Sequence, residues 1–266
     1  MDFLRPEAFF DLSSYEHAGL FEGSYLVWEA LTRISPYLQG RLRPNVADFR
    51  CFRKPLPETV ILWKGAVWRD GFEILGGDPT KGALRVRVEG SEVDDASVLY
   101  AGSVLWDEDI YIGPGVVLEP GTLVKGPTLI SGSTELRQGA YIRGKCIIGR
   151  GCVVGHTTEM KSSVMLDGAK AGHFAYIGDS VLGNSTNLGA GTKLANLKIG
   201  GTPVTIKVGG EKIDTGLRKF GAIIGDGVEI GCNAVTNPGT LLGRAAMVLP
   251  VSSVRAGYYP PESMVR

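Results

Sequence analysis

Three basic side chains, Lys125, Arg143 and Lys161, recur at intervals of eighteen residues. If one repeat of the fold has that length, the three cations lie above one another and repel unless something negative lies between them. A phosphate or carboxylate ligand is the natural partner, because arginine suits bidentate contact and lysine acts as a point charge. The alternative is a solvated basic ridge, since most surface charge runs have no function. The spacing thus marks a candidate anion site.

A histidine, His173, lies in the segment 171–179, where the periodic pattern described below loses its phase. An imidazole accepts a proton from an amine or thiol near neutral pH, so His173 is a candidate general base. The alternative is a surface histidine that only makes a structural hydrogen bond. His17 lies in the N-terminal segment, and His156 is expected at a corner of the repeat. Because these three histidines are not expected to converge, we predict no metal site.

Two asparagines, Asn187 and Asn196, flank the small residues Gly189-Ala190-Gly191. Such small residues let a ligand approach the backbone closely, and an asparagine amide both donates and accepts hydrogen bonds. Asparagine also stabilises corners of a repeat, so a structural role stays open. The cysteines Cys146, Cys152 and Cys232 are expected to fill small positions of the repeat, with no sign of an activated thiolate.

These residues belong to a regular framework, in which every sixth residue from Ile112 to Leu166 is aliphatic. A period of six fits neither an α-helix nor an ordinary amphipathic strand. It is typical of a hexapeptide β-helix, in which short strands form the walls of a prism and coils stack on one another. The period predicts that these side chains point into the prism: Ile112, Leu118, Val124, Ile130, Leu136, Ile142, Ile148, Val154, Met160 and Leu166, and later Ile224, Ile230, Leu242 and Val248, with Thr236 as the exception.

The rest of the chain divides around this framework into an N-terminal region (1–92), the β-helix (93–254) and a short tail (255–266). In the N-terminal region, a stripe at helical spacing (Val27, Leu31, Ile34, Leu38) predicts a helix that ends near Pro36, followed by short strands. This region is expected to cap or link the β-helix. Within the β-helix the period disappears over 197–221, which predicts an excursion from the solenoid, for example a hairpin. Such an excursion is either functional or a tolerated surface insertion.

The overall composition excludes several classes of protein. Lys plus Arg and Asp plus Glu number 28 each, so nothing favours nucleic acid or an anionic membrane as a partner. We expect no secretory leader, because no basic region followed by an apolar stretch begins the sequence, and no membrane span, because no apolar stretch is long enough. Four scattered cysteines do not form a disulfide framework, so we expect a cytoplasmic protein.

The ordered motifs resemble the acetyltransferase half of the bifunctional N-acetylglucosamine-1-phosphate uridyltransferase/glucosamine-1-phosphate acetyltransferase, a member of the hexapeptide-repeat acyltransferases. The resemblance covers roughly residues 98–254 and is carried by these segments: Tyr141-Ile142-Arg143, Glu159-Met160-Lys161, Lys170–Asp179, Asn187–Thr192, Ile223–Asp226 and Gly231-Cys232.

The resemblance implies a mainly β fold, a left-handed parallel β-helix with a small N-terminal α+β segment, and a homotrimer with acetyl-coenzyme A as co-substrate. His173 would be the general base and Asn196 would orient or polarise the reacting groups. Arg143, Lys161, Tyr176, Asn187 and, aligned from the downstream side, Lys219 would bind the amino-sugar phosphate, while Ala190 and Cys232 would lie beside the cofactor.

Two departures qualify this resemblance. The excursion 197–221 is longer than the corresponding loop of the family, so the position of Lys219 is open. Residues 1–92 also contain no glycine-rich nucleotide loop and are too few for a nucleotide-binding domain of that kind. The expected activity is N-acetylation of glucosamine 1-phosphate for UDP-N-acetylglucosamine and cell-envelope synthesis. Acyl transfer to another amino sugar or nucleotide sugar, or a non-catalytic trimerisation or regulatory module, is the alternative.

Overall fold

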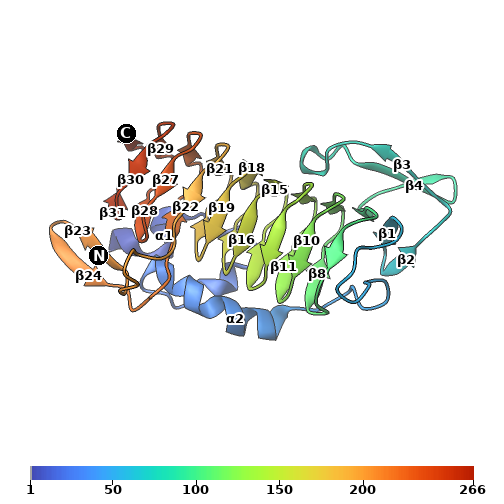
Figure 1. Cartoon of the computed structure of the whole chain (residues 1–266), viewed down its shortest axis with the longest axis horizontal. Coiled ribbons are helices and arrows are strands. Elements are labelled where there is room, and N and C mark those ends of the chain that lie inside the picture. The colour runs from blue at the N-terminus through green and yellow to red at the C-terminus, as the bar shows by residue number, and fades with distance from the viewer. Residues whose placement is uncertain (1) are drawn as a thin grey trace.

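The computed structural model describes residues 2–266 and shows a parallel β-solenoid of about nine turns (Figure 1). Successive strands take their places in three walls in turn, so each wall is a parallel sheet that runs the length of the solenoid. The predicted fold class, a mainly β chain built on a parallel β-helix, is confirmed.

The three walls are defined by their strands. The first wall contains β6 (Ser97–Leu99), β9 (Val117–Leu118), β12 (Glu135–Leu136), β15 (Val153–His156), β18 (Lys170–His173), β21 (Asn187–Leu188), β26 (Glu229–Ile230), β29 (Met247–Val248) and β32 (Met264–Val265). The second wall contains β7 (Val104–Leu105), β10 (Leu123–Lys125), β13 (Tyr141–Arg143), β16 (Glu159–Lys161), β19 (Tyr176–Gly178), β22 (Lys193–Leu194), β27 (Val235–Thr236) and β30 (Ser253–Val254). The third wall contains β8 (Ile110–Ile112), β11 (Thr128–Ile130), β14 (Cys146–Ile148), β17 (Val164–Met165), β20 (Val181–Leu182), β25 (Ala222–Ile224), β28 (Thr240–Leu242) and β31 (Gly257–Tyr259).

The aliphatic period corresponds to the interior of the solenoid, with one correction. Residues from Ile112 to Met160 at the sixth positions are buried in one core cluster. On the third wall, however, Met165 pairs with Ile148 and faces inward, while Leu166 packs outside. The prediction for Leu166 is wrong because the corner between Met160 and Met165 is one residue shorter than the preceding ones.

The shortened corner explains the loss of phase seen in the sequence. Met160 pairs with Ile142, eighteen residues earlier, but Met165 pairs with Ile148, seventeen residues earlier. The same shortening recurs between Ile177 of β19 and the inward residue of β20. Both short corners join the second wall to the third, so they change the geometry close to Lys161.

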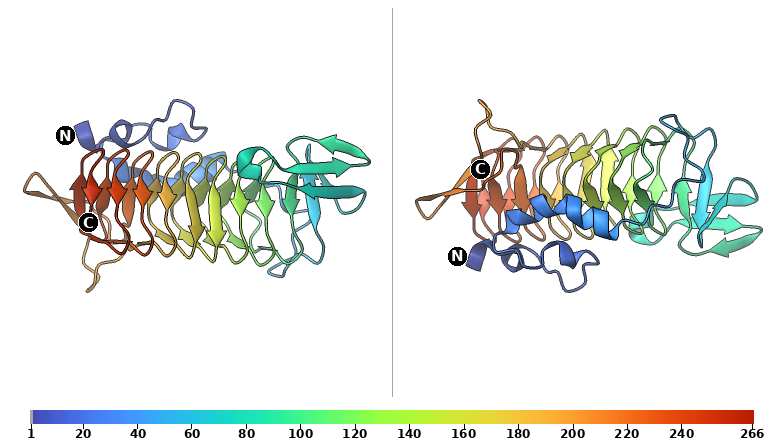
Figure 2. Two further views of the ribbon diagram at one scale, coloured as in Figure 1. Left: turned by 90° about the horizontal axis from the view of Figure 1, so that it is seen from above. Right: turned by 90° about the horizontal axis from the view of Figure 1, so that it is seen from below.

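The N-terminal segment runs along the outside of the third wall (Figure 2). It contains three 3₁₀ helices and two α-helices: η1 (Asp2–Leu4), α1 (Pro6–Phe9), η2 (Ala18–Leu20), η3 (Val27–Glu29) and α2 (Ala30–Arg41). The predicted helix therefore continues past Pro36, which lies inside α2. Burial of Ile34 and Leu38 against the wall stabilises both sides of the proline and outweighs the lost backbone hydrogen bond.

Residues 43–96 lie at the end of the solenoid opposite the C-terminus (Figure 1). They form β1 (Val60–Trp63), β2 (Ala66–Trp68), β3 (Phe72–Gly76), η4 (Pro79–Lys81), β4 (Arg85–Val88) and β5 (Ser91–Val93). β1 pairs antiparallel with β6, so it covers the edge of the first wall. Val46, Phe49 and Leu56 join the interior core cluster and close the end of the prism.

The excursion and the C-terminal residues complete the fold. Residues of the excursion form an antiparallel hairpin, β23 (Thr205–Val208) and β24 (Glu211–Asp214), whose first strand contacts β31 on the third wall. The prediction that residues 255–266 form a separate tail is wrong, because β31 and β32 continue the solenoid. Tyr259 and Val265 occupy the next inward positions and extend the core.

Candidate functional site

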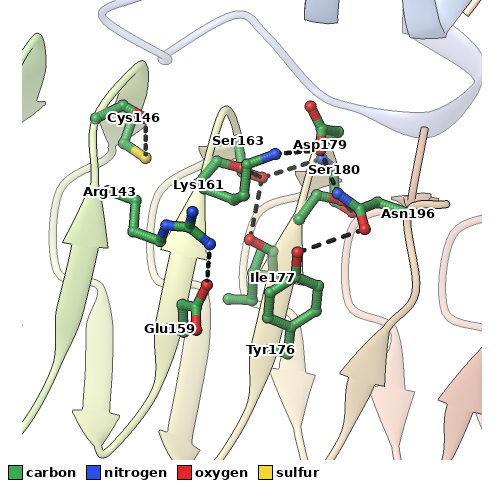
Figure 3. Close-up of polar contacts among 12 residues, drawn as sticks. Arg143, Cys146, Glu159, Lys161, Ser163, Tyr176, Ile177, Asp179, Ser180 and Asn196 are labelled. Carbon is green, nitrogen blue, oxygen red and sulfur yellow. Dashed lines mark hydrogen bonds and ion pairs between the residues drawn. The ribbon is translucent and has the colours of Figure 1, made fainter. Parts of the chain in front are cut away.

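The predicted cation column exists on the second wall. Lys125 and Arg143 are direct neighbours at the ends of β10 and β13, and Lys161 ends β16 in the next coil. Protein carboxylates lie beside two of these cations, Arg143 and Lys161 (Figure 3). Arg143 Nη1 lies 2.6 Å from Glu159 Oε1, and Lys161 Nζ lies 2.7 Å from Asp179 Oδ2. An anion that enters this column would share these cations with the carboxylates.

The part of the column that comes earlier in the sequence is built from alternating cations and aromatic rings. Lys125 Nζ lies 5.1 Å from the ring centroid of Trp106 and 5.5 Å from that of Tyr141. The Arg143 guanidinium lies 5.9 Å from the same Tyr141 ring. Ring faces attract cations at these distances, which offsets part of the repulsion between Lys125 and Arg143.

At the end of the column that comes later in the sequence, four polar side chains form one network (Figure 3). Asp179 accepts hydrogen bonds from Lys161 and from the Asn196 amide, and the Tyr176 hydroxyl lies 3.4 Å from Asn196 Oδ1. Asp179 lies in the second shortened corner, with a left-handed φ of 46°, which brings its carboxylate back toward Lys161. The network holds Lys161, Tyr176 and Asn196, three of the predicted site residues, in one place.

Glycine at the next position in the column leaves room for this network. Gly178 pairs with Lys161, and a Cβ on Gly178 would lie 2.7 Å from the Tyr176 hydroxyl and 2.8 Å from Asn196 Nδ2. Any side chain there would therefore displace Tyr176 or Asn196. Partial burial also raises the pKa of Tyr176, so its hydroxyl is a neutral hydrogen-bond donor at physiological pH. The bond to Glu159 raises the pKa of Arg143, which stays fully charged.

His173 lies on a different edge of the solenoid, at the end of β18 where the first wall meets the second. Its ring is exposed, and within residues 2–266 it makes no side-chain hydrogen bond. Phe174 and Ala175 separate it from β19, whose far end, Gly178, is the neighbour of Lys161. His173 and the cation column therefore flank Tyr176 on opposite sides and do not touch each other.

The structure stacks His173 with both residues predicted to lie beside a cofactor. Backbone hydrogen bonds run from Phe174 N to His156 O, from Gly191 N to His173 O, from Asn233 N to Ala190 O and from Val251 N to Cys232 O. His156, His173, Ala190 and Cys232 thus occupy equivalent positions in four consecutive coils, which we call the edge column. Cys232 is exposed there, while burial raises the pKa values of Cys146 and Cys152 to about 12.

The two remaining predicted site residues lie close to this edge or to the polar network. Asn187 begins β21 on the first wall, where its amide donates to Glu229 Oε2 at 2.9 Å. The exposed Lys219 lies where the excursion returns, because Phe220 N donates to Asn196 O at 2.9 Å. The chain thus returns from the excursion next to Asn196, and Lys219 is the residue just before this backbone hydrogen bond.

Sequence reasoning assigned no place in the site to Asp179, Gly178 and His156, which the structure puts beside predicted site residues. Asp179 and Gly178 stand in the motif that carried the resemblance, but their functions depend on a corner length that the sequence pattern did not reveal. His156 was expected at a corner and was assigned no function. No group of three His, Cys, Asp or Glu side chains within residues 2–266 is placed to hold a metal ion.

Known proteins resemble this chain in the sequence of its solenoid region. The family model described as "GMPPB C-terminal domain" matches residues 124–210. The bifunctional sugar-1-phosphate nucleotidylyltransferase/acetyltransferase of Sulfurisphaera tokodaii is 42% identical over 94 residues, which are 35% of this chain and 23% of that protein. The bifunctional protein GlmU of Methanococcus vannielii is 37% identical over 93 residues, 35% of this chain and 22% of that protein. The match thus spans less than a quarter of either relative.

One of the similar solved structures is the UDP-N-acetylglucosamine acyltransferase of Francisella novicida. It has a TM-score of 0.32 and 14% sequence identity, and the match covers 59% of this chain and 60% of that one. A TM-score this low does not establish a shared fold, so the fold assignment depends on the strand pairing of the chain itself. None of the helices in the described residues has the length and apolar character of a membrane span. Over about a third of its length, then, the chain is similar to bifunctional nucleotidylyltransferase/acetyltransferases, as its motifs predicted.

Proposed function

We propose that this chain is an acetyl-coenzyme A-dependent N-acetyltransferase that acts on an amino-sugar phosphate, with glucosamine 1-phosphate as the acceptor. The observation that carries the proposal is the arrangement of Arg143 and Lys161 on one side of Tyr176 and of His173 on the other. The name of the Sulfurisphaera tokodaii relative combines sugar-1-phosphate chemistry with acetyl transfer, which supports this substrate class.

The separation of the two groups suits such a substrate. An amino-sugar phosphate carries an anionic phosphate and a nucleophilic amine at different positions of one ring. Arg143 and Lys161 would bind the phosphate by charge-assisted hydrogen bonds, while the sugar spans the second wall over Tyr176. The amine would then lie at the edge column, near His173.

The reaction we propose is direct acyl transfer without a covalent enzyme intermediate. The amine nitrogen attacks the thioester carbonyl carbon of acetyl-coenzyme A, and His173 takes the proton that the nitrogen loses. The new C–N bond forms as the C–S bond breaks, and the departing coenzyme A sulfur receives the proton that His173 took up, which restores the neutral imidazole. Asn196 and Tyr176 would orient the sugar from the polar network, with Asn187 and Lys219 as further contacts.

The cofactor would lie along the edge column. Ala190 and Cys232 follow His173 in consecutive coils, and Ala190 leaves room for close approach to its backbone. In this proposal the protein is a cytoplasmic homotrimer, in which acetyl-coenzyme A binds between neighbouring copies, and its product serves UDP-N-acetylglucosamine and cell-envelope synthesis.

The test is a steady-state assay of coenzyme A release with glucosamine 1-phosphate. We expect His173→Ala to keep its oligomeric state and to lose about 10²- to 10⁴-fold in kcat. Arg143→Ala is expected mainly to raise the KM for the sugar phosphate. Full activity of His173→Ala would exclude the proposed mechanism. A panel of other amino sugars and nucleotide amino sugars tests the acceptor, and a failure to bind coenzyme A at millimolar concentration would favour a non-catalytic module.

A further inference from the structure

A second imidazole lies directly beside the proposed base. His156 pairs with His173 across β15 and β18, one coil apart, at the spacing of about 4.8 Å between neighbouring strands. Phe174 N donates to His156 O at 2.8 Å, which fixes the two backbones in register. The His156 side chain is half-buried and lies on the same edge of the solenoid as His173.

The ring of His156 has a defined orientation. Its Nδ1 lies 3.1 Å from the backbone carbonyl oxygen of Gln138 in the preceding coil. A carbonyl oxygen only accepts hydrogen bonds, so Nδ1 of the neutral imidazole must carry the proton. The other nitrogen, Nε2, is then left as an acceptor that has no hydrogen-bonding partner within residues 2–266.

An exposed aromatic ring completes the surface around both imidazoles. The ring of Phe174 lies 5.1 Å from the ring of His156 in an edge-on arrangement and 6.5 Å from the ring of His173. Phe174 itself is 51% exposed, so its ring is open to a ligand on this edge. The apolar face of a sugar ring packs well on such an aromatic side chain.

From these contacts we propose that His156 is a positioning residue for the acyl acceptor, and this inference rests on the proposed function. Its Nε2 accepts a hydrogen bond from the hydroxyl group next to the reacting amine, while the sugar ring packs on Phe174. His156 thereby holds the amine toward His173 without taking part in proton transfer. The residue determines acceptor specificity, because an acceptor without that hydroxyl leaves Nε2 unpaired.

The test compares His156→Phe and His156→Ala with the wild-type protein in the same coenzyme A release assay. The phenylalanine variant keeps a ring against Phe174 and removes both nitrogens. We expect both variants to raise the KM for glucosamine 1-phosphate by about 3- to 10-fold, the loss of one neutral hydrogen bond, with kcat and the pH profile of kcat unchanged. With the 3-deoxy analogue of glucosamine 1-phosphate, the variants should show no higher KM than the wild type, because the hydrogen bond to Nε2 is already lost.

Gln138→Ala is the matched control, since it changes a side chain on the same edge but keeps the carbonyl that holds His156. It should leave the KM unchanged. A wild-type KM in His156→Phe would overturn the proposal, as would a shifted pH profile, which would mark His156 as a base.

Calorimetric titration with glucosamine 1-phosphate separates this inference from the proposed reaction. If the protein binds the sugar phosphate without turnover, the reaction is wrong, while the ratio of Kd values between variant and wild type still decides the role of His156. Absence of binding overturns both.

Discussion

Lys161 Nζ and Asp179 Oδ2 form a 2.7 Å ion pair on the wall where we place the sugar phosphate. Both side chains are mostly buried, so Lys161 is held in one position before a ligand arrives. Lys161→Ala is expected to raise the KM for glucosamine 1-phosphate by about 10- to 100-fold, the contribution of one charge-assisted hydrogen bond, with a smaller change in kcat. Steady-state kinetics at fixed ionic strength measure both constants.

Lys207→Ala is the control for this charge change, because Lys207 is an exposed cation of the hairpin strand β23. It should leave both constants unchanged. If Lys161→Ala and Lys207→Ala behave alike, the column does not bind the phosphate.

Exposed and buried thiols should differ sharply in reactivity. Cys232 is exposed in the edge column, whereas burial raises the pKa values of Cys146 and Cys152 to about 12 and keeps them as thiols. We expect a maleimide at pH 7.5 to modify Cys232 well before the two buried cysteines. Acetyl-coenzyme A at ten times its Kd should slow the modification of Cys232 about tenfold, because about a tenth of the sites stay free. Mass spectrometry of the peptides follows each site.

The partly buried Cys51 provides an internal reference for this labelling, since it lies in the N-terminal region far along the chain from the edge column. Acetyl-coenzyme A should not change its rate. If acetyl-coenzyme A slows the labelling of Cys51 and Cys232 equally, or does not slow the labelling of Cys232, a cofactor site at this edge is excluded.

His17 should make the stability of the protein depend on pH. Its ring is buried between Tyr37 Oη at 3.2 Å and Ser131 Oγ at 3.1 Å, so it joins α2 and the N-terminal segment to the solenoid. Burial lowers the pKa of His17, which Arg41 lowers further, against the opposing charges of Glu16 and Asp167.

The unfolded chain therefore binds a proton at His17 near the ordinary pKa of 6.5, while the folded chain does not until a lower pH. Below pH 6.5 the unfolded state binds more protons, so the free energy of unfolding falls as the pH falls. We expect the Tm of the wild-type protein to drop more between pH 7.5 and pH 5 than that of His17→Gln. An identical drop in both proteins would show that His17 does not contribute.

One interior hydroxyl should destabilise the solenoid. Thr236 occupies the inward position that breaks the aliphatic period, and its Oγ1 is buried without a hydrogen-bond partner in the described chain. Thr236→Val is expected to raise the free energy of unfolding by about 1 kcal/mol, because it removes an unsatisfied polar group at nearly constant volume. Denaturant unfolding measures the difference.

Thr240→Val is the matched control for this substitution. Thr240 is equally buried, but its hydroxyl donates to the carbonyl of Asn237 at 2.8 Å. The same chemical change should therefore destabilise the protein there. A loss of stability in both variants would mean that the Thr236 hydroxyl has a partner in solution.

The sequence alone determined the solenoid and much of its register. A strict period of six allows one arrangement of inward side chains, so the stacking of Lys125 on Arg143 could be read from their spacing. The choice between Met165 and Leu166 could not be read, because both are apolar and either would fill an inward position. That choice depends on whether Leu166 packs on the N-terminal segment, which is a contact distant in sequence.

Only the tertiary structure decided how the site is assembled. The shortened corner places Asp179 against Lys161, and the pairing of β21 with β26 across the excursion brings Ala190 and Cys232 into the edge column with His173. A repeat pattern records which residues share a wall, because that follows from local spacing. It does not record corner lengths or side-chain partners, because these depend on how successive coils pack on one another.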